Sequence, residues 1–393
     1  MPGQIALEGN QAVAEAMRQI NPDVVAAYPI TPSTEIVQIF SKYVADGLVD
    51  TEFVAVESEH SAMSACIAAS VAGGRVMNAT SSAGMALMWE MLYIAASIRT
   101  PIVLALVNRA LSGNINIHCD HSDAMGARDA GWLQLFCENA QEAYDTMFQA
   151  VKIGEDLDVR LPVMVCLDGF IISHSVEMVA VEEDEKIREW VGPYTPNRPL
   201  LDLENPYTVG PLDLQDFYFE HKRSQVEGYV PVPGIIESVG ASFEEQFGRS
   251  YGLLEAYQCD DAESVVVSLG STAGMVKDTV DQMRAEGKKV GGLKIRSYRP
   301  FPADLVADIL RDCKSVAVLD RAMSFGAAAS PLFADVTSAL YTRGASVPTA
   351  TYVYGLGGRE MMPEYIEQVF ADLESVAAAG AVDPALKYLG LRE

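Results

Sequence analysis

Two carboxylates, Glu57 and Glu59, stand where the apolar segment 51–56 gives way to a segment rich in alanine and serine. Acidic residues are favoured at such a position simply because they face the positive end of a following helix. A partly buried carboxylate there can also hold a proton against a ring nitrogen of a heterocycle, or exchange it. If the extended conformation continues this far, Glu57 and Glu59 point to one side of the strand and Ser58 to the other.

A hydroxyl group is placed in a similar position by the loop YPITPST, residues 28–34. Pro29 and Pro32 restrict the backbone on either side of Thr31, so a stiff loop presents its hydroxyl. Such a hydroxyl suits a hydrogen bond to a small carbonyl acid. Ser33 is expected to cap the helix that follows, a role that leaves Thr31 free for binding.

A guanidinium, that of Arg109, ends the apolar run 101–107. It can clamp a substrate carboxylate with two parallel hydrogen bonds, and the alternative is a structural ion pair with Asp120 or Asp123. His118 and His121 lie in the same loop and, with the two aspartates, superficially resemble metal ligands. Their spacing fits no common coordination geometry, so turn and capping roles are favoured for the aspartates and no metal is expected.

The loops that carry these side chains are predicted to share one edge of a sheet. Short apolar segments typical of buried strands occupy residues 23–30, 51–58, 75–82, 101–110 and 161–170. Helical patterns follow at residues 33–44, 60–74 and 83–97, and the last helix is expected to be buried. This alternation indicates a parallel sheet covered on both faces, whose ligands bind at the carboxyl ends of the strands.

The chain changes character between residues 182 and 250, where Pro, Tyr, Asp and Glu dominate. We interpret this stretch as a connector with an arm, not as a domain core, and predict a polar amphipathic helix near 213–227. A second alternation of strands and helices begins near residue 261 and ends in a helical tail. The predicted fold is therefore α/β with two doubly wound domains: residues 1–255, with the connector arm from about 182, and residues 256–393.

Two glycine-rich loops in the second block could bind a phosphate at a helix N-terminus, SLGST at 268–272 and YVYGLGGRE at 352–360. Neither contains the full GxGxxG pattern, so plain tight turns are favoured and a nicotinamide-dependent dehydrogenase is disfavoured.

Composition excludes several other classes. The net charge of -26, from 54 acidic and 28 basic residues, disfavours nucleic acid and anionic membranes as partners. Six scattered cysteines form no CxxC pair, which argues against zinc and iron–sulfur sites and favours reduced thiols in the cytoplasm. No segment is expected to act as a signal peptide or to span a membrane.

Taken together, the loops resemble the alpha chain of the 2-oxoacid:ferredoxin oxidoreductases, and in particular the pyruvate-using branch. The resemblance depends on the joint occurrence, in the family's order, of AAYPITPST, VESEHSAMSA, NRALSGNINIHCDHSDA, LDGFIISH, GPLDLQDFYFEHKR, LKIRSYRPFP, VLDRAMSFG and YVYGLGGRE. It implies a pyrimidine-binding domain of a thiamine diphosphate enzyme, followed by a domain similar to the C-terminal domain of transketolase.

The resemblance also implies roles for particular residues. Glu59 matches the glutamate that hydrogen-bonds the pyrimidine N1′ and promotes the imino tautomer, whose nitrogen deprotonates the thiazolium C2. Thr31 and Arg109 match the residues that hold the carbonyl and carboxylate of pyruvate. The other residues expected to contact the cofactor are Tyr28, Pro29, Ile30 and Ser82.

Further subunits are implied as well. A beta chain would hold the diphosphate and its Mg²⁺, since this chain has no GDG-type motif, and [4Fe-4S] clusters would lie in the beta and delta chains. A gamma chain, ferredoxin and coenzyme A complete the expected partners. The neutral Thr31 beside a single Arg109 favours pyruvate over oxalate or 2-oxoglutarate. The alternatives are another 2-oxoacid such as 2-oxoisovalerate, a non-catalytic assembly subunit, and a nucleotide-binding module that uses SLGST.

Overall fold

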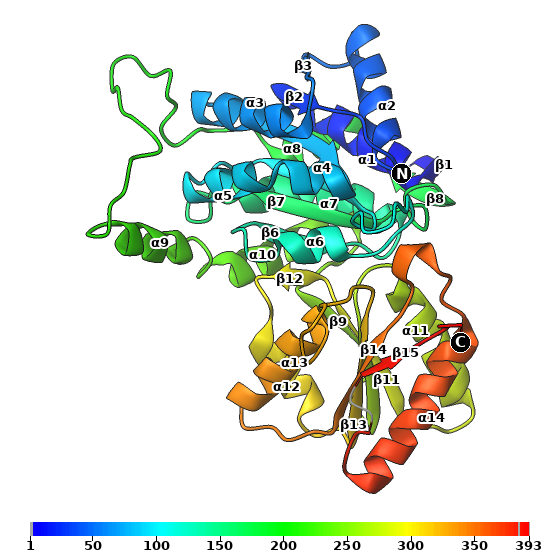
Figure 1. The fold of residues 1–393 in the computed structure, drawn as a ribbon. Coiled ribbons are helices and arrows are strands. Elements are labelled where there is room, and N and C mark those ends of the chain that lie inside the picture. Colours follow the sequence, from blue (N-terminus) through cyan, green and yellow to red (C-terminus); the bar gives the residue numbers. More distant parts are fainter. Residues whose placement is uncertain (1–2, 384–385, 393) are drawn as a thin grey trace.

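The computed structural model describes residues 3–383 and 386–392, which form two α/β units stacked on each other (Figure 1). The first unit carries a seven-stranded sheet and the second a six-stranded sheet. A separate antiparallel pair, β1 (Gly3–Glu8) with β8 (Val176–Val181), lies beside the first sheet. Within these residues, no helix is both long and apolar enough to cross a bilayer. All six cysteines are unpaired.

The first sheet has the strand order β12-β6-β7-β5-β4-β2-β3, and all of its strands are parallel except β12. Its central strands are continuous apolar runs because helices cover both faces. The strands are β2 (Val24–Ala27), β3 (Glu52–Ala55), β4 (Val76–Thr80), β5 (Val103–Asn108), β6 (Leu133–Phe136), β7 (Val163–Asp168) and β12 (Ser297–Arg299).

One face of this sheet packs against α1 (Gly9–Ile20), α2 (Thr34–Ala45), α7 (Ala140–Glu155) and α10 (Val232–Phe247). The other face packs against α3 (Glu59–Ala72), α4 (Ser82–Leu87), α5 (Trp89–Ser97) and α6 (Ser122–Ala127). The core on this second face includes the edge-on pair of Phe136 and Tyr298 and continues into the second unit at Val267 and Leu269.

The second sheet has the order β15-β14-β13-β10-β11-β9, with β9 antiparallel to the rest. Helices α11 (Thr272–Ala285) and α14 (Pro363–Ala379) cover one face, and α12 (Ala303–Leu310) and α13 (Pro331–Thr342) cover the other. The strands are β9 (Leu254–Tyr257), β10 (Ser264–Ser268), β11 (Val290–Ile295), β13 (Ser315–Asp320), β14 (Thr349–Val353) and β15 (Leu386–Tyr388). The expected fold class, α/β with two doubly wound units, is confirmed.

Several local predictions were wrong. The helix expected at 83–97 breaks at Met88 and is buried on one side only, because its apolar residues Leu87, Trp89, Tyr93 and Ile94 face outward. The tail is not wholly helical, since β15 follows α14. Strand β6 and helices α6, α7 and α13 were not predicted.

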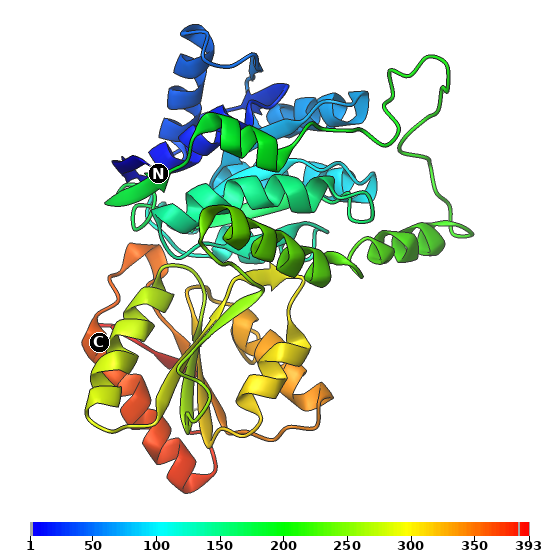
Figure 2. The same cartoon turned by 180° about the vertical axis from the view of Figure 1, so that it is seen from behind.

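The stretch 182–250 is only in part a surface connector. Helix α8 (Asp184–Val191) leads into a long arm, and α9 (Tyr218–Glu227) lies apart from the core without a buried residue (Figure 2). Helix α10, however, buries Ile236 and Phe243 and belongs to the core of the first unit. The domain boundary at 255/256 stays a prediction. It would fall inside β9, while β12 of the second half joins the first sheet.

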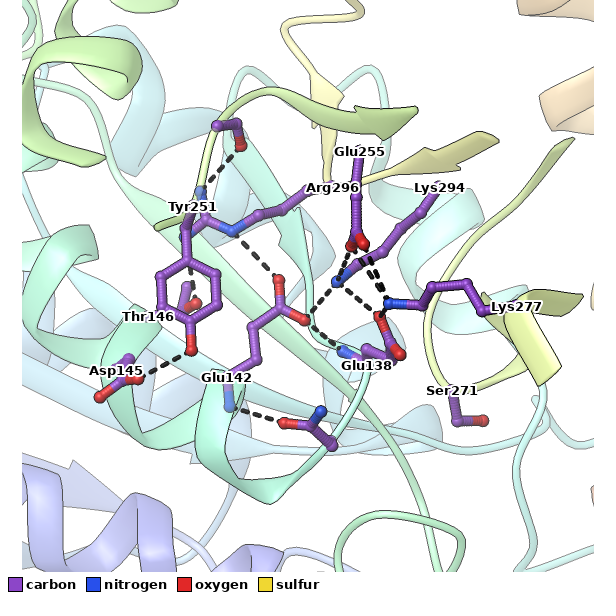
Figure 3. Close-up of polar contacts among 12 residues, drawn as sticks. Glu138, Glu142, Asp145, Thr146, Tyr251, Glu255, Ser271, Lys277, Lys294 and Arg296 are labelled. Carbon is purple, nitrogen blue, oxygen red and sulfur yellow. Dashed lines mark hydrogen bonds and ion pairs between the residues drawn. The ribbon is translucent and has the colours of Figure 1, made fainter. Parts of the chain in front are cut away.

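An ionic network joins the two units (Figure 3). Lys294 on β11 donates to Glu142 at 2.6 Å and to Glu138 at 2.9 Å. Arg296 Nε lies 3.3 Å from Glu142 Oε1, and Lys277 donates to Glu138. These groups are largely buried, and the carboxylates raise the pKa of Lys294 despite its burial, so the ammonium stays charged.

We expect Lys294→Met to lower the free energy of unfolding by about 3 kcal/mol, because it leaves two buried carboxylates short of a cation. Urea unfolding measures this loss. The matched control is Lys314→Met, which removes an exposed, solvent-screened ion pair with Glu263 and should change stability far less. Equal losses in the two variants would contradict the stabilising role of the buried network.

Candidate functional site

Four loops meet at the carboxyl edge of the first sheet, as the sequence predicts. They follow β2, β3, β4 and β5, which are parallel neighbours in the order β5-β4-β2-β3. Because the strands run in one direction, the loops 28–33, 56–58, 81–82 and 109–121 all emerge at that edge.

Glu59 is buried at the first turn of α3 and is 5% exposed. The N-cap of this helix is Ser58, whose hydroxyl accepts the backbone N–H of Ser61 at 3.3 Å. Among the described residues, no hydrogen-bond donor or cation is paired with the Glu59 carboxylate. The carboxylate is therefore free to accept a hydrogen bond from a bound ligand.

Glu57 differs from Glu59 completely. It is exposed and accepts a short hydrogen bond from Ser61, which holds the pKa of its carboxyl below the usual range. The condition for both carboxylates to point to one side is not met, because β3 ends at Ala55 and Ser58 already caps the helix.

Gly84 on α4 lies directly against Glu59. A Cβ at this position would stand 2.7 Å from Glu59 Oε1 and 2.4 Å from Thr80 Oγ1, so any larger residue would displace them. The buried hydroxyls of Thr80 and Ser81 have no hydrogen-bond partner in the described structure. The cradle that only glycine permits holds the Glu59 carboxylate beside α4, and this unpaired carboxylate suits a polar heterocycle.

The backbone of the YPITPST loop is held by a side chain of α1. Asn10 on α1 donates to Pro32 O at 2.7 Å, and the Thr31–Pro32 peptide bond is cis. Thr31 is exposed on this fixed loop. Ser33 occupies the cap position of α2 but does not cap it, because its hydroxyl donates instead to Ile30 O. The remaining residues of the loop, Tyr28 and Pro29, are exposed, and Ile30 is half-buried.

Arg109 is brought to Thr31 by the structure. Its Nη1 donates to Thr31 O at 2.8 Å and its Nε to Asn116 O at 3.1 Å. Neither suggested ion pair forms, because Asp123 accepts the backbone N–H of Arg109 and Asp120 accepts from Ser122. Two of five guanidinium N–H groups are therefore used, and three stay available for a carboxylate.

Ser82 links two of the loops instead of standing open. It is fully buried with φ 42°, its hydroxyl donates to Ala110 O, and its N–H donates to Asp123 Oδ2 at 2.9 Å. Burial raises the pKa of Asp123 to about 6, although four N–H donors oppose the shift. Asp123 thus holds the loops after β4 and β5 together. A direct contact between Ser82 and a cofactor stays a prediction.

Asp168, at the end of β7, is the central acceptor between the two units. Its Oδ1 lies 2.7 Å from His121 Nε2, and its Oδ2 accepts the N–H and hydroxyl of Ser271 at 3.1 and 2.5 Å. Arg321 Nη1 stands 3.7 Å from the same oxygen. Burial alone would raise the pKa of Asp168, but His121 and Arg321 hold it below its usual range.

The two glycine-rich loops of the second unit pack against Asp168 and against the loop after β5. At the start of α11, the place that a phosphate would take is filled by the Asp168 carboxylate, and a Cβ on Gly270 would lie 2.9 Å from it. Gly357 and Gly358 leave space for Asn116 and His118, which a Cβ would approach to 2.3 and 2.4 Å. Both loops therefore serve close packing, as expected for tight turns.

A metal centre is not favoured. Among the described residues, the one group of potential ligands is Cys119, His121 and Asp168. The buried guanidinium of Arg321 interacts with both Asp168 and Cys119, and it would repel a cation. Burial, first of all, raises the pKa of the Cys119 thiol well above its usual value.

Sequence reasoning missed Asp168, Ser271, Arg321 and Gly84. The motifs LDGF, SLGST and LDRA contain the first three, yet nothing in one sequence shows that strand ends 100 residues apart face each other. The sequence did contain a signal for Gly84. Glycine inside a helix normally costs stability, so a glycine just after the start of the predicted helix indicates a close contact there.

Comparison with known proteins agrees with this geometry. A family model described as pyruvate flavodoxin/ferredoxin oxidoreductase, thiamine diphosphate-binding, matches residues 15–241. A second, described as pyruvate:ferredoxin oxidoreductase core domain II, matches residues 262–366.

Curated relatives match over nearly the full chain. Pyruvate synthase subunit PorA of Thermotoga maritima is 56% identical over 99% of this chain and 98% of its own, and that of Methanocaldococcus jannaschii is 43% identical over 98% of each. Ketoisovalerate oxidoreductase subunit VorA of Pyrococcus horikoshii is 40% identical over 100% of this chain and 99% of its own.

Solved structures share the fold. A 2-oxoglutarate:ferredoxin oxidoreductase from Magnetococcus marinus superposes with a TM-score of 0.72 at 20% identity, over 94% of this chain but 65% of its own. A split-gene transketolase gives 0.51 at 13% identity, over 95% of this chain and 97% of its own.

We expect Asp168→Asn to cost about 3 kcal/mol of stability near neutral pH, because it leaves Arg321 buried without a carboxylate. A depressed folded-state pKa contributes stability that is complete above the unfolded pKa of about 4 and is lost as pH falls below it. The difference between wild type and variant, measured by urea unfolding, should therefore shrink as pH falls below about 4. A difference that does not change with pH would contradict the assigned ionisation.

Proposed function

The chain belongs to the pyruvate flavodoxin/ferredoxin oxidoreductase family, and on that premise we propose that it is the alpha subunit of a pyruvate:ferredoxin oxidoreductase, or pyruvate synthase. The enzyme decarboxylates pyruvate oxidatively and reversibly, transfers the acetyl group to coenzyme A and passes the electrons to ferredoxin. The near-complete coverage of relatives with that name supports the assignment.

One observation carries the proposal: Glu59 is a buried carboxylate with no partner among the described residues. In the proposed site, thiamine diphosphate supplies the carbon nucleophile and the electron sink. Glu59 holds a proton at the pyrimidine N1′, and Gly84 lets α4 pack against the carboxylate and fix its position.

Arg109 and Thr31 hold the substrate in this proposal. The three unused N–H groups of Arg109 bind the carboxylate of the 2-oxoacid, and the Thr31 hydroxyl donates to its carbonyl. Because the guanidinium also grips Thr31 O, the two substrate contacts keep a fixed separation. A single cation beside a neutral hydroxyl suits a monocarboxylate.

Pyruvate is favoured over a branched 2-oxoacid by the 56% identical relative. More distant relatives do not separate the two substrates, because the ketoisovalerate enzyme matches at 40%, close to the 43% of an archaeal pyruvate synthase. A non-catalytic assembly role is disfavoured, because an abandoned site would not retain a costly unpaired carboxylate.

A partner chain completes the site. Helices α4 and α5 begin at the Glu59 cradle and continue as a surface with exposed Leu87, Trp89, Tyr93 and Ile94. An apolar surface beside a site is typical of an interface. In our proposal a beta chain covers it and holds the diphosphate with Mg²⁺, while [4Fe-4S] clusters in the beta and delta chains carry electrons to ferredoxin. A gamma chain completes the complex.

We expect Glu59→Gln, in the reconstituted complex, to reduce pyruvate-dependent ferredoxin reduction by at least about 100-fold, because an amide cannot hold the proton at N1′. Steady-state turnover with saturating thiamine diphosphate measures it. Glu57→Gln is the matched control, since Glu57 is two residues away and exposed, and it should retain nearly full turnover. Near-normal turnover of Glu59→Gln would refute the assigned role.

Arg109→Lys should raise KM for pyruvate by about 10- to 100-fold, because a lysine ammonium cannot form two parallel hydrogen bonds. The initial rate as a function of pyruvate concentration gives KM. The affinity of the complex for thiamine diphosphate should stay unchanged, which separates a substrate contact from a damaged cofactor site. An unchanged KM for pyruvate would remove Arg109 from the proposed site.

A further inference from the structure

A polar cavity lies at the opposite edge of the first sheet from Glu59. Its volume is about 200 Å³, and three arginines line it: Arg99, Arg160 and Arg198. Arg99 precedes β5 and Arg160 precedes β7, so both lie at the amino ends of the strands. Arg198 belongs to the arm between α8 and α9.

The arm closes this cavity. Leu200 donates its N–H to Val71 O at 2.8 Å, and a Cβ on Gly73 would lie 2.9 Å from Pro199. The arm is thereby fixed across the C-terminal end of α3, with Arg198 beside the two arginines of the sheet edge.

None of the three guanidiniums has an ion-pair partner in the described structure. Arg99 donates to Asp158 O and Val159 O, and Arg160 donates to Tyr194 OH and Thr195 O. Among the described residues, no aspartate or glutamate lines the cavity. Unpaired arginines are unexpected in a chain with 54 acidic and 28 basic residues, most of whose other arginines form ion pairs.

The guanidinium of Arg160 is buried and has an N–H group without a partner. The residue is 6% exposed, and its Nε has no hydrogen-bond partner, as is also true of Arg99 Nε. Both residues have left-handed backbones, with φ 56° for Arg99 and 45° for Arg160. Residues other than glycine rarely adopt this backbone conformation, and those that are held in it cluster at functional sites.

The surrounding charges leave the cavity positive. Helices α3, α5 and α7 end at this edge, and each contributes about half a negative charge, against three full positive charges. The nearest carboxylates interact with these arginines without forming an ion pair: Asp158 attracts Arg99, and Glu155 attracts Arg160. Glu155 already forms an ion pair with Arg75.

We propose that this cavity binds a phosphate-type oxyanion, separately from the thiamine diphosphate site. Planar guanidiniums are the side chains that best match phosphate oxygens. The volume is below the roughly 300 Å³ of a pocket for a larger organic ligand, so a free phosphate or the phosphate group of a small ester fits best. An anion there would tie the arm to the sheet edge.

Isothermal titration calorimetry of the full chain with inorganic phosphate, at constant ionic strength in chloride, tests the proposal. We expect saturable binding of one phosphate per chain. A parallel titration with glycerol 3-phosphate, a small ester, distinguishes the two sources: tighter binding of glycerol 3-phosphate indicates a phosphate ester, and weaker binding indicates the free ion. Arg198→Gln should lower the affinity for the preferred ligand about tenfold or more, and Arg198→Lys should lower it less.

Arg198 is the suitable site for substitution because it is exposed and its side chain packs only on the Tyr207 ring, so the fold should persist. The matched control is Arg343→Gln, which removes an exposed arginine of the second unit and should leave phosphate binding unchanged. The proposal is overturned if wild type shows no saturable binding of either ligand, or if Arg198→Gln and Arg343→Gln have the same affinity.

Discussion

A carboxylate buried without a partner is the constraint on which the account of this protein depends. Glu59 is held at the start of α3, only 5% exposed, by the packing of α4 through Gly84. Keeping an unpaired carboxylate there costs stability, and ligand binding can offset that cost only by supplying a donor. A heterocyclic nitrogen able to share a proton meets this requirement, and the family model that matches residues 15–241 is described as thiamine diphosphate-binding.

The rest of the structure fixes the loops around this carboxylate. Asp123 holds the loops after β4 and β5 together. Arg109 hydrogen-bonds the loop after β2. Asp168 connects the first unit to the second through Ser271 and Arg321. Each of these contacts uses a charged group, and those of Asp123 and Asp168 are buried or partly buried. The second α/β unit therefore serves to hold the first unit's loops in place, and its glycine-rich loops do so by close packing.

The sequence predicted those parts of the fold that depend on local pattern. Apolar runs ended by polar loops located the strands, their shared edge, and Thr31, Glu59 and Arg109. Long-range contacts were not predictable: Glu57 and Glu59 look alike in sequence, and only the early end of β3 separates them. Likewise, the exposed face of 83–97 has the composition of a core helix, because an interface and a core require the same residues.

The proton at C2 of bound thiamine diphosphate reports the role of Glu59 without involving substrate, coenzyme A or ferredoxin. Its exchange with deuterium, followed by NMR after rapid quenching, compares the wild-type complex with Glu59→Gln. The account predicts exchange at least about 100-fold slower in the variant, at equal cofactor occupancy. Equal exchange rates would show that this carboxylate does not activate the cofactor, and the central claim would fail.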